Sequence, residues 1–156
     1  MRYQDELLIQ APIERVWALT LDVERWPDAT PTITEVARLD DGPFGVGSQA
    51  RIKQPAQSAR VWTVTRLEEP VCFEWETTVG PIRLRGGHHL SAEGDGCRNR
   101  LTLDIEGFGS RLLALLVGRS MRKAIATENA GFKTVAEAGD GPGPRQGQDA
   151  GGASTA

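Results

Sequence analysis

The chain has 156 residues, and 18 Lys and Arg residues against 21 Asp and Glu residues give a net charge of −3 at neutral pH. This length suits one domain with a sizeable core, and the lack of a basic stripe argues against a nucleic-acid-binding protein. The start, MRYQDELLIQ, has acids where a signal peptide needs an apolar stretch, and the longest apolar run, LLALLV at 112–117, is too short to span a bilayer. We therefore expect a soluble, cytoplasmic protein without a membrane span.

The N-terminal segment predicts one strand followed by two short helices. Residues 2–10 alternate as a strand does, although Asp5 interrupts the apolar side. Residues 11–22 predict a short helix with Pro12 at its start, where the missing N–H costs nothing. Pro27 and Pro31 then limit a second helix to a turn or two.

The middle of the chain predicts consecutive strands separated by turn signals such as DDGPFGVG and EGDG. In the strand at 59–68 either of two alternating sets can face inward, and we favour the set with Arg60, Trp62 and Val64. Short strands joined this tightly favour an antiparallel meander. The predicted strands cover residues 32–39, 47–54, 59–68, 71–79, 82–92 and 97–106.

A long amphipathic helix is predicted from about Ser110, a suitable N-cap, to about Ala138. Glu128 falls in the middle of its apolar face, which consists of Val117, Met121, Ala124, Phe132 and Val135. The opposite face carries polar residues, namely Arg111, Arg119, Arg122, Asn129 and Lys133. We expect a domain at 1–138 and a disordered tail at 139–156, which is rich in Gly and Pro and has no large apolar residue.

These elements predict an α+β fold, with a curved antiparallel sheet of about seven strands wrapped around the long C-terminal helix. Two short helices lie between the first two strands. Small inward residues such as Gly86 and Ala124 predict a cavity between the sheet and the helix.

Several segments carry a resemblance to a known superfamily: APIERVWALTLDVERWP at 11–27, GVGSQARIKQP at 45–55, WTVTRLEEPVCFEWET at 62–77, GGHHL at 86–90 and GDGCRNRLTLDIEGFG at 94–109. With the order of elements, they resemble the START-like, helix-grip (SRPBCC) superfamily, particularly its polyketide cyclase/dehydrase and lipid-transport branch. The resemblance covers nearly all of the chain except the tail. It implies an internal cavity for a lipophilic ligand, and it carries little information on chemistry because members share no single catalytic motif.

Glu128 is the residue that most needs an explanation, because an unpaired buried carboxylate is costly. His88 is its best candidate partner, since strand alternation turns His88 inward and His89 outward. Such a pair can hydrogen-bond a carbonyl or hydroxyl of a ligand, or act as general acid and base. The structural alternatives are a Glu128 near the rim or paired with an arginine, and a His88 that is a satisfied core residue.

Strand alternation and helical spacing also predict the lining of the cavity. Tyr3, Arg60, Phe73 and Thr77 are weaker candidates that rest on strand alternation alone, and the tryptophans have a core role as the alternative. The predicted ligand-binding residues are Trp26, Trp62, Phe73, Trp75, Thr77, Leu84, His88, Leu103, Met121, Ala124, Glu128 and Phe132. We predict no metal or cofactor, since Cys72 and Cys97 match no metal-ligand spacing and phosphate-loop, dinucleotide and serine-hydrolase motifs are missing.

The sequence and the resemblance lead us to expect one of two functions. The favoured one is binding, as a carrier or by sequestration, of a lipid, polyketide or aromatic compound in the cavity. The alternative is a cyclase or dehydratase that uses Glu128 and His88 as general acid and base on a polyketide-like substrate. A protein-binding module is a third class, which the sequence disfavours because it shows no large exposed apolar face. The oligomeric state is expected to be monomer or homodimer.

Overall fold

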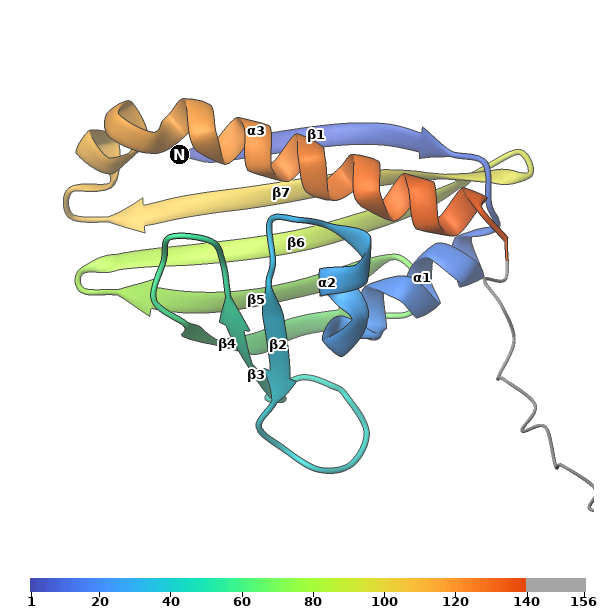
Figure 1. Ribbon diagram of the computed structural model, residues 1–156, viewed down its shortest axis with the longest axis horizontal. Helices are drawn as coiled ribbons and strands as arrows, with labels where there is room; N and C mark the ends of the chain where they lie inside the picture. The colour runs from blue at the N-terminus through green and yellow to red at the C-terminus, as the bar shows by residue number, and fades with distance from the viewer. Residues whose placement is uncertain (140–156) are drawn as a thin grey trace, which may run out of the picture.

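The computed structural model describes residues 1–139, and the predicted α+β helix-grip fold is confirmed (Figure 1). All seven strands pair antiparallel in one sheet with the order β1-β7-β6-β5-β4-β3-β2. The predicted tail falls almost entirely on residues 140–156, outside the described residues. The strands are β1 Arg2–Ile9, β2 Glu35–Arg38, β3 Gln49–Lys53, β4 Arg60–Glu68, β5 Cys72–Val79, β6 Ile82–Glu93 and β7 Gly96–Gly107.

The helices lie close to their predicted places. Between β1 and β2 are α1 (Ile13–Leu21), a one-turn 3-10 helix (Val23–Arg25) and α2 (Trp26–Ala29), and the long helix is α3 (Ser110–Glu137). The predicted N-cap of α3 is wrong by one residue. Gly109 occupies that position with φ 85°, and no side chain caps the helix. Glycine tolerates this left-handed conformation, which lets the chain turn sharply from β7 into α3.

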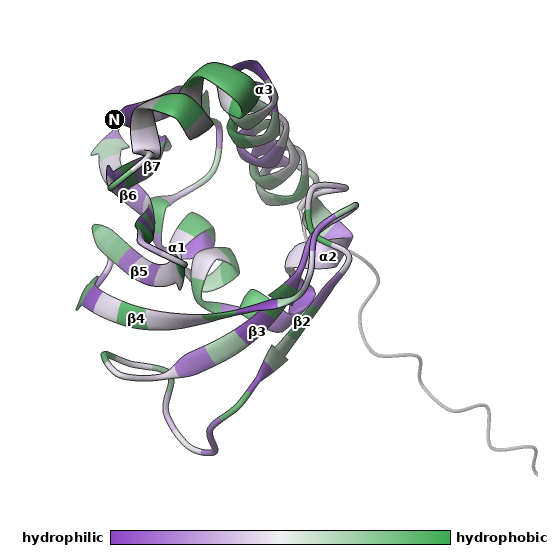
Figure 2. Cartoon of the chain, turned by 90° about the vertical axis from the view of Figure 1, so that its left-hand side faces the viewer, coloured by the Kyte–Doolittle hydropathy of each residue, from purple (hydrophilic) through white to green (hydrophobic). Residues whose placement is uncertain are grey.

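The sheet curves around the interior (Figure 2), and α3 crosses its open side along β1 and β7 (Figure 1). Strand β4 follows the favoured alternation at first, because Val64 is buried and Val61 is exposed. A register shift between Val64 and Arg66 then leaves Thr65 without a partner in the pairing of β4 with β5. This β-bulge turns Leu67 toward the core and Arg66 to the surface, whereas strict alternation would place Arg66 inside and Leu67 outside.

The buried face of α3 differs from the prediction. Asn129, predicted on the polar face, is completely buried. Its Nδ2 donates to Asp5 Oδ2 at 2.8 Å and to the Asn99 carbonyl at 3.3 Å, and its Oδ1 accepts from Asn99 Nδ2 at 3.1 Å. Ile125, Phe132 and Ala136 of α3 are buried in the core, and the partly buried Met121 packs against it. A polar network between β1, β7 and α3 therefore replaces one apolar contact and fixes how the helix is rotated.

The start of α3 and the turn before it expose a cluster of large apolar side chains, which the sequence analysis did not anticipate. The exposed fractions are 89% for Phe108, 62% for Leu112, 81% for Leu115 and 73% for Leu116. Among residues 1–139, no helix combines the length and apolarity that crossing a membrane requires.

Candidate ligand-binding cavity

A cavity of about 470 Å³ lies between the inner face of the sheet and α3. This volume is in the range of pockets that hold small organic ligands. Three indole rings contribute to its wall, from Trp26 on α2, Trp62 on β4 and Trp75 on β5. The rest of the lining is Ile33, Ile52, Gln54, Gln57, Arg60, Val79, Leu84, Gly86, Gly87, His88, Leu101, Thr102, Leu103, Val117, Ser120, Met121, Ala124, Ile125 and Glu128.

The structure brings most of the predicted ligand-binding residues together around this cavity. The predicted residues found in its wall are Trp26, Trp62, Trp75, Leu84, His88, Leu103, Met121, Ala124 and Glu128, with Arg60 from the weaker candidates. They come from six elements, so the chain assembles the wall from segments far apart in sequence. As ligand contacts they stay predictions.

Four other predicted residues lie outside the cavity wall. Phe73 and Phe132 have exposed fractions of 0% and 1%, and both rings pack edge-on against the Trp26 indole. They fill the core behind the cavity. Tyr3 is buried with Leu101 and Ile125 in a separate cluster. Thr77 is buried between Trp75 and Val79 along β5, and those two larger side chains line the cavity instead.

His88 and Glu128 meet in the wall as predicted, from β6 and α3. His88 Nε2 lies 3.7 Å from Glu128 Oε1, and the two side chains are 3% and 18% exposed. The imidazole is surrounded by aromatic rings, with centroid distances of 5.2 Å to Trp26, 4.9 Å to Phe132 and 6.1 Å to Phe73. His88 Nδ1 is buried and has no hydrogen-bond partner among residues 1–139. The pair is thus a polar spot in an aromatic and aliphatic wall.

The buried polar network explains why Glu128 faces inward. Asn129, the next residue, is held on the sheet by its hydrogen bonds to Asp5 and Asn99. Neighbouring helical residues differ by about 100° in direction, so fixing Asn129 toward β1 and β7 points Glu128 toward the cavity. The alternation of β6 turns His88 to the same space. Asp5, the residue that breaks the apolar pattern of the first strand, was the sequence signal for this network.

Glycine at position 86 makes room for an indole ring. A Cβ placed on Gly86 would lie 3.0 Å from Trp75 Nε1 and 3.7 Å from Trp62 Cζ3. Any larger residue therefore pushes one of these rings into the cavity or out of the wall. The Trp75 ring thus fills the space beside Gly86, the small inward residue from which the cavity was predicted. The cavity lies beyond this ring.

Sequence reasoning missed the polar residues between β3 and β4. Gln54 and Gln57 line the cavity from this loop, next to Arg60 at the start of β4. Gln57 is exposed, so the cavity reaches the surface here. The segment QPAQ has the composition of a turn, and its role in the wall follows only from the way the β3–β4 hairpin folds over the sheet.

Comparison with solved structures places the fold among known proteins. Protein TTHA0849 from Thermus thermophilus superimposes with a TM-score of 0.74 at 22% identity, over 90% of this chain and 100% of that one. A START superfamily protein from Mycobacterium smegmatis gives 0.69 at 16% identity, over 88% and 97%. The Zhui aromatase/cyclase from Streptomyces sp. R1128 gives 0.63 at 20% identity, over 89% and 98%. At these identities the likeness shows a shared fold.

No curated protein is significantly similar in sequence to this chain. The model of one family, described as polyketide cyclase / dehydrase and lipid transport, matches residues 2–137. That match takes in every helix and strand of the structure. The chain therefore belongs to the polyketide cyclase/dehydrase and lipid transport family.

Proposed function

We propose that the protein binds a hydrophobic small molecule, a lipid, polyketide or aromatic compound, in the cavity between the sheet and α3. The observation that carries this proposal is the cavity of about 470 Å³, whose wall combines apolar and aromatic side chains with the His88–Glu128 pair. Such a pair can hydrogen-bond a ligand carbonyl or hydroxyl. The surrounding indole rings supply apolar area for the rest of the ligand.

The position of Glu128 supports an orienting role. Its carboxylate lies 3.7 Å from His88 Nε2, longer than a good hydrogen bond, so neither group is committed to the other and each can bond to a ligand hydroxyl beside them. The ligand would be held by apolar contacts along its length and oriented by one or two polar contacts, as in most small-molecule pockets.

A direct test fills the cavity from α3. Ala124→Trp places a large ring where the cavity is now, whereas Ala130→Trp makes the same substitution at an exposed position of the same helix. With anilinonaphthalene sulfonate as a fluorescent probe, we expect Ala124→Trp to weaken binding at least about tenfold and Ala130→Trp to leave it unchanged. Equal affinity in the two variants overturns the proposal. Ala124→Leu serves as the milder variant if the tryptophan prevents folding.

Native mass spectrometry of freshly purified protein identifies the natural ligand. A retained molecule with an apolar body and a carbonyl or hydroxyl group supports the proposal. Retention of the same molecule by Ala124→Trp contradicts it, because the molecule then lies outside the cavity.

The alternative function is a cyclase or dehydratase, and the His88–Glu128 pair favours it specifically. An imidazole and a carboxylate facing one enclosed space can transfer protons to and from a polycarbonyl chain, worth about 10²- to 10⁴-fold in rate. The structural likeness to an aromatase/cyclase is compatible with such chemistry on this fold. Enclosure by the sheet and α3 would also hold a flexible chain in a reactive conformation.

Turnover separates the two functions. With a synthetic β-polyketone thioester as substrate, an enzyme should lose activity in Glu128→Gln and His88→Gln while these variants still bind the probe. Glu106→Gln, a charge-neutralising change at an exposed residue of β7, should keep full activity. A carrier binds the thioester and releases it unchanged in all of these proteins.

A further inference from the structure

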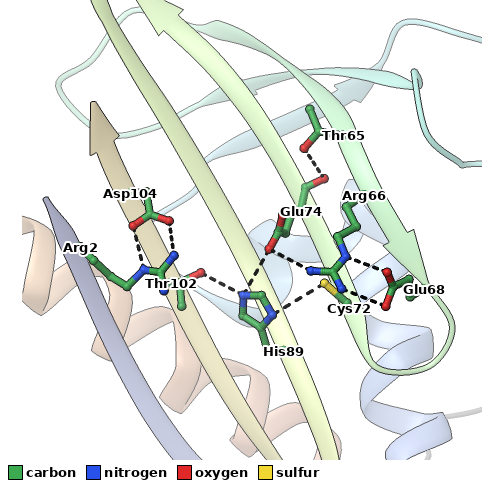
Figure 3. Close-up of polar contacts among 9 residues, drawn as sticks. All are labelled: Arg2, Thr65, Arg66, Glu68, Cys72, Glu74, His89, Thr102 and Asp104. Atoms are coloured by element: carbon green, nitrogen blue, oxygen red, sulfur yellow. Dashed lines mark hydrogen bonds and ion pairs between the residues drawn. The ribbon is translucent and has the colours of Figure 1, made fainter. Parts of the chain in front are cut away.

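A second group of reactive side chains lies on the outer face of the sheet, away from the cavity wall. Cys72 on β5 is paired across the strands with His89 on β6, and Glu74 is the next outward residue of β5 (Figure 3). One potential ligand atom from each residue lies within 4.8 Å of those of the other two. These three residues, the outer-face cluster, have no part in the proposed ligand binding.

The outer-face cluster has the right spacing for a metal ion. Cys72 Sγ lies 3.7 Å from His89 Nδ1. In a tetrahedral site with Zn–S of about 2.3 Å and Zn–N of about 2.0 Å, the sulfur and nitrogen atoms are about 3.5 Å apart. The backbone already holds this separation, so an ion fits between the two atoms without a change of strand register. The Glu74 carboxylate becomes the third ligand when its side chain rotates toward the ion.

The surroundings of His89 direct the correct nitrogen at the thiol. His89 Nε2 faces two oxygen atoms, Thr102 Oγ1 at 3.2 Å and Glu74 Oε1 at 3.7 Å. The Thr102 hydroxyl can accept the Nε2 proton, and in this tautomer the lone pair of Nδ1 points toward Cys72 Sγ and leaves Glu74 free to turn to the ion. A histidine whose other nitrogen is held by an oxygen partner is the usual arrangement of a metal ligand.

Glycine at position 87 creates the space for this arrangement. Gly87 lies between the outer-face side chains of Glu74 and Thr102, its partners on the two neighbouring strands. A Cβ on Gly87 would lie 3.0 Å from both His89 Nε2 and Thr102 Oγ1. The His89 ring therefore lies over a position that carries no side chain, and any other residue there tilts the ring away from its present contacts.

The charges beside the outer-face cluster leave its carboxylate available. The Cys72 thiol gives up its proton to solvent as the metal–sulfur bond forms. Arg66 lies 3.8 Å from Glu74, but it is held by two shorter bonds to Glu68, at 2.8 and 3.0 Å. The Glu74 carboxylate is thus only weakly engaged.

We propose that Cys72, Glu74 and His89 form a binding site for a divalent transition-metal ion on the convex face of the sheet. Thiolate sulfur, imidazole nitrogen and carboxylate oxygen together are a donor set suited to Zn²⁺. Three protein ligands leave the fourth position of a tetrahedral ion open to water or to another molecule. This site is independent of the cavity, and its existence does not depend on which function the cavity has.

Cobalt titration of protein without a polyhistidine tag tests the site. Tetrahedral Co²⁺ bound to a thiolate gives a charge-transfer absorption that aqueous Co²⁺ lacks, and Zn²⁺ should abolish it by competition. We expect this absorption at one equivalent of metal in the wild type, its loss in Cys72→Ser, and its retention in Cys97→Ala, the matched control at the other buried thiol. Wild-type protein without this absorption, or Cys72→Ser with it undiminished, overturns the proposal.

Two further variants keep the test decisive if Cys72→Ser does not fold. Glu74→Gln preserves the shape of the side chain and should weaken Zn²⁺ binding by at least about tenfold. Arg66→Gln removes the nearby cation and should strengthen it. Zn²⁺ should also raise the melting temperature of the wild type by more than that of Glu74→Gln. Unchanged Zn²⁺ affinity in both variants contradicts the assignment.

Discussion

Asn99 and Asn129 are joined by a side-chain hydrogen bond of 3.1 Å, and neither residue has any exposed surface. Asn129 also donates to Asp5 at 2.8 Å. Loss of a hydrogen-bond partner in such surroundings costs free energy. The network therefore sets the rotation of α3, and with it the direction of Glu128.

Asn129→Leu tests how much this network contributes to the free energy of unfolding. The substitution leaves the Asn99 amide and the Asp5 carboxylate without their partner, and we expect the free energy of unfolding to fall by about 2 to 4 kcal/mol. Urea denaturation measures it, with Ala130→Leu as the control at the exposed neighbour. If the two variants are equally stable, the hydrogen bonds do not hold the helix.

Gly131 lets α3 approach α2 more closely than any other residue permits. A Cβ at this position would collide with the carbonyl oxygen of Ala29, a backbone atom that cannot turn aside. We expect Gly131→Ala to lower the free energy of unfolding by more than about 2 kcal/mol and to weaken probe binding, because α2 carries Trp26. Thermal unfolding and probe titration measure both effects. Gly45→Ala is the control, since nothing lies within 4 Å of a Cβ there.

Stability at acidic pH should depend on Asp104. Arg2 donates to this carboxylate from Nε at 2.8 Å and from Nη2 at 2.7 Å, and these bonds lower the pKa of Asp104 below its usual 3.8, against the opposing effect of burial. A carboxylate with a lowered pKa in the folded state stabilises the protein above its unfolded pKa. That contribution is lost as the pH falls from about 4 through the folded pKa.

Asp104→Asn should therefore cost about 1 kcal/mol at neutral pH, a small figure because the Arg2 side chain is 62% exposed. The difference from the wild type should shrink as the pH falls from about 4 through the folded pKa of Asp104. Denaturant unfolding across this pH range measures it, and Asp95→Asn in an exposed turn is the control. A difference that persists undiminished at the acidic end excludes a titrating ion pair as the cause.

Tryptophan emission should report occupancy of the cavity. Trp26, Trp62 and Trp75 line it, whereas Trp17 is buried elsewhere in the core. Energy transfer to bound anilinonaphthalene sulfonate should decrease in Trp62→Phe and remain in Trp17→Phe. The opposite pattern would place the probe outside the cavity.

The fold was predictable because strand alternation and turn residues are local signals. The favoured set in β4 was correct at Trp62 and Val64, but nothing in the sequence marked the bulge at Thr65, which depends on how β4 meets β5. Asn129 was misassigned because an asparagine is usually a surface residue, and its partners Asp5 and Asn99 come from distant strands.

The candidate site was predictable in part for the same reason. His88 and Glu128 lie on elements whose inward faces follow from their periodicity. The proximity of Cys72 and His89 follows from the register between β5 and β6 rather than from a short motif, so spacing rules for metal ligands did not find it. Gln54 and Gln57 belong to a loop whose path no periodicity describes.

In strand β6, a single layer of backbone separates the cavity from the outer face of the sheet. Leu84, Gly86 and His88 belong to one side of this partition, and His89 belongs to the other. A substitution scan along the strand should consequently separate two effects: changes at Leu84, Gly86 and His88 alter small-molecule binding, and a change at His89 alters metal binding.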